Sequence, residues 1–146
     1  MTRVRTLGTA LAVSFAALFA TAALAEPAAW DQAQVTTIAK DLAAAGDAWE
    51  QAVRRQPGMT VGSGAAQEEF GLLQKARILR EQSGALSAEL AAGKGFDKTH
   101  DMYRSLKEIV DDTEVNAQRA ELDEPTMDAW AKVADAMRRI APYYTK

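Results

Sequence analysis

Cysteine is absent from the 146 residues, and histidine occurs only once, at position 100. Without cysteine the chain forms no disulfide, carries no thioether-linked lipid and cannot hold haem through a Cys-x-x-Cys-His motif. The sequence also lacks the two-residue alternation of polar and apolar side chains, and the Asn-Gly or Asp-Gly turns, that are typical of β-hairpins. These absences favour a helical protein that is held together by its core alone.

The first 25 residues have the three parts of a secretory signal peptide. Arg3 and Arg5 form a basic start, residues 11–20 are mostly apolar, and Ala23-Leu24-Ala25 resembles a signal-peptidase site. The apolar stretch is interrupted by threonine and serine and is shorter than the roughly 20 residues of a membrane helix. We therefore expect cleavage after residue 25 and export, in a bacterium to the periplasm. An uncleaved N-terminal anchor is the alternative.

Residues 26–146 form one predicted domain, because a chain of this length buries a single core without disulfides. The signal segment contains two basic and no acidic residues, so the remaining 121 residues carry 15 basic and 20 acidic side chains. A mildly acidic domain is a poor ligand for nucleic acid or for anionic lipid, since both require a basic patch. We expect a soluble protein with neither partner, and with no stable membrane anchor after cleavage.

Apolar residues recur every three or four positions in four segments of this domain, which is the spacing of a helix with one buried face. In the second segment, Phe70 widens the apolar stripe. The predicted fold is all-α: an antiparallel up-down-up-down four-helix bundle after the signal peptide. Its helices are expected over residues 31–55, 64–92, 97–121 and 124–142.

Helix ends are marked by residues that satisfy free backbone groups. Asp31, Asp97 and Asp123 precede apolar runs and are predicted to cap the first, third and fourth helices. Pro125 suits the first turn of the fourth helix, and Pro57-Gly58 ends the first.

A metal site is one interpretation of the only histidine. Asp97, His100 and Asp101 share one face at the start of the third helix, where they could present two or three ligands to Zn²⁺. A surface capping turn explains the same residues, because a helix N-terminus favours acidic side chains. The capping interpretation is the one we adopt, and we predict no cofactor.

Non-covalent haem is the alternative ligand, held by His100 and Met137 near one end of the bundle. Cytochrome b562 and cytochrome c′ have this shape, but the comparison rests on shape alone. Gly62-Ser63-Gly64 resembles part of a nucleophile elbow, yet it lacks the preceding strand that this motif requires. We therefore predict no catalytic residues and no enzyme.

The remaining functional hypothesis is protein binding. A mixture of tryptophan, tyrosine and arginine is typical of interface anchors, and exposed loops bind partners more often than they merely connect elements. The candidate residues are four aromatic side chains at the end that holds both termini and two apolar side chains in the opposite loop: Trp30, Phe96, Tyr143, Tyr144, Met59 and Val61. The sequence thus favours an exported, non-catalytic interaction module that binds a partner protein or itself.

Overall fold

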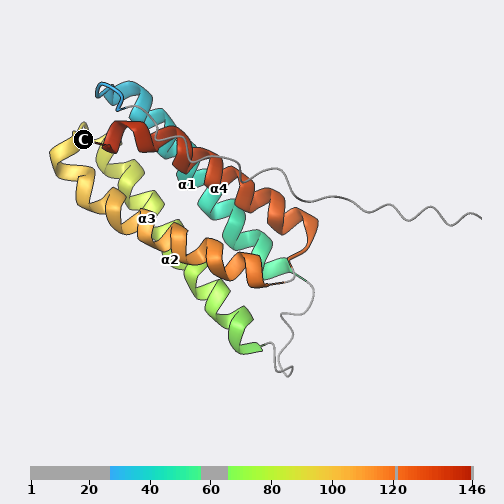
Figure 1. Ribbon diagram of the computed structural model, residues 1–146. Coiled ribbons are helices and arrows are strands. Elements are labelled where there is room, and N and C mark those ends of the chain that lie inside the picture. Colours follow the sequence, from blue (N-terminus) through green and yellow to red (C-terminus); the bar gives the residue numbers. More distant parts are fainter. Residues whose placement is uncertain (1–26, 57–65, 121, 146) are drawn as a thin grey trace, which may run out of the picture.

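The computed structural model describes residues 27–56, 66–120 and 122–145, which form four helices and no strand (Figure 1). The helices are α1 (Gln32–Arg55), α2 (Ala66–Ala91), α3 (Phe96–Arg119) and α4 (Glu124–Tyr144). The predicted all-α class is confirmed. None of these helices is both long enough and apolar enough to cross a membrane. The predicted signal segment, residues 1–25, lies outside the described residues.

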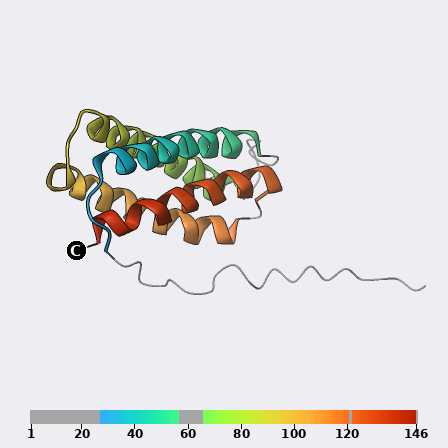
Figure 2. The same ribbon diagram turned by 90° about the horizontal axis from the view of Figure 1, so that it is seen from above.

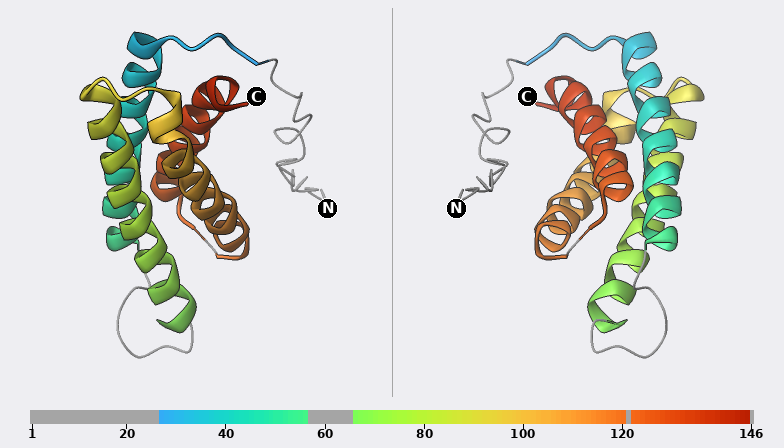
Figure 3. Two further views of the ribbon diagram at one scale, coloured as in Figure 1. Left: turned by 90° about the vertical axis from the view of Figure 1, so that its left-hand side faces the viewer. Right: turned by 90° about the vertical axis from the view of Figure 1, so that its right-hand side faces the viewer.

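Each helix packs against two of the others. α1 lies against α2 and α4, α2 also contacts α3, and the contact between α3 and α4 is the smallest of the four. Figure 2 shows α1 and α4 side by side along most of their lengths. In Figures 1 and 3 the first turns of α2 extend beyond the other helices, so this end of α2 is covered least.

The core is built from the apolar stripes that the sequence shows. Leu42, Leu79, Leu86 and Leu106 are completely buried, and each contributes roughly 1.5–3 kcal/mol through removal of its side chain from water. Phe70 is an exception, because its side chain is 68% exposed on the projecting part of α2. The prediction that Phe70 widens the buried stripe was wrong, because its position on α2 faces solvent among the described residues.

Two of the three predicted caps are present. The carboxylates of Asp31 and Asp123 accept hydrogen bonds from backbone N–H groups in the first turns of α1 and α4, each at 3.0 Å. The predicted cap of α3 was wrong: Gly95 occupies the capping position, and Asp97 lies inside the first turn. The turn before α3 passes through Gly93 at a φ of 81°, which glycine adopts without strain, and α3 begins directly after Gly95.

The C-terminus of α4 continues past the expected end at residue 142. Pro142 has no N–H group and cannot donate to the preceding turn, yet the helix runs on to Tyr144. Tyr144 is 5% exposed, so the burial of its side chain stabilises the helix beyond Pro142. The backbone N–H of Ala28 donates to the carbonyl of Pro142 at 2.9 Å, which ties the start of the domain to its end.

α1 and α2 approach each other closely at Gly46. A Cβ atom at this position would lie 2.9 Å from Ser83 Oγ, 3.0 Å from Leu79 Cδ2 and 3.4 Å from the Cα atom of Arg80. Real Cβ atoms do not approach other atoms so closely, so an alanine at position 46 would require the buried side chains of Ser83 and Leu79 to move.

Substitution of two helical glycines by alanine should therefore have opposite consequences. At Gly84 a Cβ atom meets nothing within 4 Å, so Gly84→Ala should raise the free energy of unfolding by about 0.5–1 kcal/mol through helix propensity. Gly46→Ala should be less stable than Gly84→Ala by about 1 kcal/mol, because the buried side chains of Ser83 and Leu79 must move to make room for the methyl group. Urea unfolding followed by circular dichroism measures both, and equal stabilisation would contradict the proposed close packing.

Candidate functional site

A cluster of aromatic rings closes the end of the bundle where the domain begins and ends. Trp30 meets Phe96 edge-on at a centroid distance of 5.9 Å and meets Tyr144 at 5.4 Å. Tyr103 stacks on Tyr144 at 4.2 Å with nearly parallel planes. Such offset and edge-on pairs contribute about 0.5–1.5 kcal/mol beyond area burial. The rings come from the segment before α1, from α3 and from α4.

Polar contacts in the same cluster link α1 to α2 and α3 to α4. The indole N–H of Trp30 donates to the Gln32 side chain at 3.1 Å, and the Gln32 amide donates to the backbone carbonyl of Leu90 at 2.9 Å. The Thr99 hydroxyl donates to the carbonyl of Gly95 at 3.0 Å. The hydroxyl oxygens of Thr99 and Tyr144 lie 2.7 Å apart and share a hydrogen bond in which either group can donate.

The structure brings together three of the six predicted interaction residues, Trp30, Phe96 and Tyr144. Tyr144 is buried, while Trp30, Phe96 and Tyr143 are partly buried against the core. These rings therefore contribute to closing the bundle. The other two predicted residues, Met59 and Val61, lie outside the described residues.

The residues considered for haem or metal have different surroundings. The His100 ring packs on Phe96 at 5.0 Å and is half-exposed, while Met137 is buried in the core. Asp97 and Asp101 are exposed. Within residues 27–56, 66–120 and 122–145 there is no group of three histidine, aspartate or glutamate side chains that could hold a metal ion.

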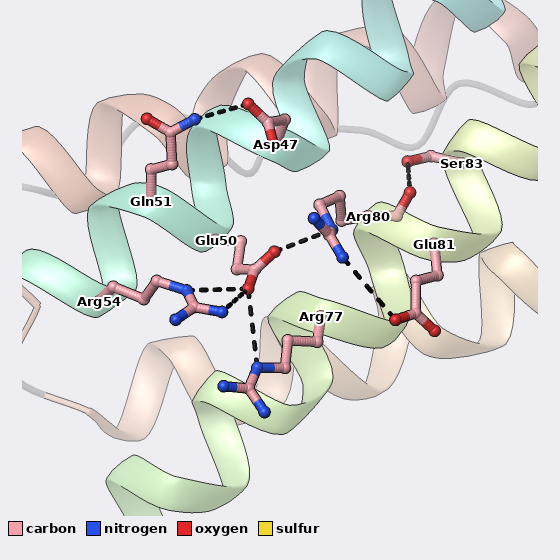
Figure 4. A network of polar contacts seen from close by, with 8 residues as sticks. All are labelled: Asp47, Glu50, Gln51, Arg54, Arg77, Arg80, Glu81 and Ser83. Carbon is pink, nitrogen blue, oxygen red and sulfur yellow. Dashed lines mark hydrogen bonds and ion pairs between the residues drawn. The ribbon is translucent and has the colours of Figure 1, made fainter.

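Glu50 forms an ion cluster that the sequence analysis missed (Figure 4). Its side chain is only 4% exposed, although glutamate is seldom buried unless it is paired. Glu50 Oε1 accepts a hydrogen bond from Arg54 Nε at 2.9 Å and also contacts Arg54 Nη2. Arg80 Nε lies 2.9 Å from Oε2, and Arg77 Nε lies 3.7 Å from Oε1. One buried carboxylate thus holds three guanidinium groups from α1 and α2.

Part of this cluster has a local sequence signal. Glu50 and Arg54 are one helical turn apart on α1, and Arg77 and Arg80 are three residues apart on α2. What the sequence does not show is that these two pairs meet, since that depends on how the helices align. The approach at Gly46, one turn before Glu50, sets this alignment.

Two shallow grooves lie on the surface of the bundle. One follows the contact of α1 with α4 and has a floor of alanines that includes Ala44, Ala48 and Ala131. The other lies between α2 and α3, has a volume of about 300 Å³ and is lined by Ile78 and Ile109 among others.

Comparison with known protein families, with curated proteins and with solved structures gives no match to this chain.

The buried tyrosines of the aromatic cluster should make the protein sensitive to alkaline pH. Burial raises the pKa of Tyr144 above its ordinary value of 10.0, although the hydrogen bond with Thr99 acts in the opposite direction. Burial likewise raises the pKa of Tyr103, with the negative charge of Asp111 as a second cause. A raised pKa in the folded state means that stability is full below pH 10 and is lost as the pH rises through the folded-state values.

Tyr144→Phe tests this expectation. The variant loses one hydrogen bond and should be about 1 kcal/mol less stable at neutral pH. Between pH 9 and 11 it should lose less stability than the wild type, because one ionising group has gone. Urea unfolding at each pH, together with the ultraviolet absorbance of tyrosinate, provides the measurement. Equal pH dependence in the two proteins would contradict the role given to Tyr144.

Proposed function

We propose that this protein is an exported, non-catalytic interaction module that acts in the bacterial periplasm. In this proposal residues 1–25 direct export and are removed, and the rest works as an up-down-up-down bundle. Three features support it: the three-part N-terminal segment, the absence of cysteine with a single histidine, and an exposed apolar surface on α2 and α3.

The exposed apolar surface is the observation that carries the proposal. Phe70 is 68% exposed, Ile78 38% and Val115 46%. Single exposed apolar residues are common, whereas exposed apolar residues that share one surface mark binding sites. Phe70 and Ile78 are eight residues apart on α2, so they lie on one face of this helix. This face adjoins the groove that Ile78 and Ile109 line between α2 and α3.

The chemistry of this surface favours a protein partner. Its apolar side chains are flanked by an ion pair between Lys75 of α2 and Asp112 of α3, which also lines the groove. An apolar strip with a charged border is typical of grooves that accept the apolar face of a partner helix. We therefore propose that a helix of a second protein, presenting apolar side chains, binds between α2 and α3.

Site-specific photo-crosslinking in the native host tests this surface. A photoreactive phenylalanine analogue in place of Phe70 should give one defined adduct with another protein, whose mass is then determined. The matched control carries the analogue in place of Asp128, which is exposed on α4, the helix that does not contact α2. The adduct should be several-fold weaker when Ile78 is also changed to serine, because the groove loses its apolar wall.

The outcome distinguishes the partners. An adduct of this chain with itself, supported by a dimer mass in light scattering, would replace the second protein by self-association. Equal labelling from positions 70 and 128, or no effect of Ile78→Ser, would exclude a specific surface on α2 and α3.

Export is tested separately by the mass of the protein recovered from the periplasmic fraction. We expect a mature chain that starts at Glu26, because Ala23 and Ala25 are the small residues that signal peptidase requires. Ala25→Arg should leave the 25-residue segment attached, whereas Ala20→Ser, outside the cleavage site, should not. Recovery of the uncleaved wild-type chain from the cytoplasm would contradict this part of the proposal.

A further inference from the structure

The cluster around Glu50 carries more positive than negative charge. Arg54, Arg77 and Arg80 surround one buried carboxylate, and guanidinium groups keep their charge at every physiological pH. Glu81 contacts Arg80 at 3.8 Å, but it is 66% exposed and is therefore strongly screened by water. The concentration of positive charge is unexpected, because the chain as a whole has a net charge of −3.

Each of the three arginines has more N–H donors than its contacts with Glu50 and Glu81 use. Their side chains are 44–51% exposed, so part of each guanidinium group faces water. Glu50 is contacted through Nε of all three and through Nη2 of Arg54, and Glu81 is contacted through Nη2 of Arg80. Each guanidinium group can thus still donate to a ligand on the solvent side.

The cluster is also held in a defined geometry. Arg77 and Arg80 project from α2 and Arg54 from α1, and all three point toward Glu50 in Figure 4. α1 and α2 pack closely beside this cluster, at Gly46 next to the backbone of Arg80, which restricts how the two helices can move relative to each other. Donors that are already placed lose little conformational entropy when they bind an anion.

We propose that Arg54, Arg77 and Arg80 form a binding site for a small divalent oxyanion, such as sulfate or a phosphate group, on the solvent side of Glu50. Three guanidinium groups around one buried carboxylate give the cluster an excess of positive charge that the exposed Glu81 at its edge only partly offsets, so a divalent anion is attracted more strongly than a monovalent one. Guanidinium forks also match the oxygen spacing of phosphate and sulfate. This site goes beyond the proposed protein interaction and does not depend on it.

Nuclear magnetic resonance titration of the full chain tests the site. Sodium sulfate should shift the Nε–H signals of the three arginines in a saturable way, and acetate should bind at least about tenfold more weakly because it carries one charge. Sodium chloride at the same ionic strength is the reference. Phosphate and glycerol phosphate are compared in the same way: binding of both indicates a site that accepts the group on a larger molecule, and binding of phosphate alone indicates a free ion.

Two matched variants complete the test. Arg77→Gln should raise the sulfate dissociation constant about tenfold, because it removes one of the three guanidinium groups. Arg77 makes the longest contact with Glu50 and is half-exposed, so the fold should tolerate the change, as circular dichroism can verify. Arg138→Gln removes an exposed arginine from α4 and should change the constant by less than about twofold.

A third variant separates geometry from charge. Arg77→Lys keeps the charge but loses the planar fork, and it should bind sulfate more weakly than the wild type. The proposal is overturned if chloride produces the same shifts as sulfate, or if Arg77→Gln and Arg138→Gln weaken binding equally. Either result would reduce the cluster to an internal ion-pair network.

Discussion

The close crossing of α1 and α2 at Gly46 is the contact on which the arrangement of the ion cluster depends. Because a Cβ atom there would meet Ser83 at 2.9 Å, the two helices approach nearer than side chains on both would allow. Glu50 follows one turn later on α1, and Arg80 precedes Ser83 by one turn on α2. The burial of Glu50 beside arginines of another helix follows from this crossing, as does the excess of positive charge around it.

The opposite kind of contact closes the other end of the bundle. There the chain uses large rings, and Tyr144 packs against Trp30 and Tyr103 while its hydroxyl bonds to Thr99. Edge-on and stacked rings fill the space between the helices at this end, and the hydrogen bond of the buried hydroxyl restricts how the rings pack. The aromatic side chains first considered as binding anchors contribute to closing the bundle. Three of the exposed apolar side chains, Phe70, Ile78 and Val115, lie on α2 and α3, and Met127 lies on α4.

Several features of the fold could be predicted because their causes are local. Asp31 and Asp123 cap helices that follow them directly, and a cap depends only on the next three residues. Predictions failed where the burial of a residue or the start of a helix depends on other segments of the chain. Phe70 has the right spacing for a core residue, but no neighbouring helix covers it. Asp97 has the right chemistry for a cap, yet the turn at Gly93 lets α3 begin just after Gly95.

The sequence by itself determined the helical class and the buried stripes, because periodicity and capping act over a few residues of one chain segment. Only the tertiary structure decided which polar groups meet: Thr99 with Tyr144, 45 positions apart, and Glu50 with Arg77 and Arg80 of the next helix. The local spacing of residues along one helix does not specify which side chain of another helix they will contact. That pairing is set by the distance and alignment of the helices, which depend on packing at positions such as Gly46.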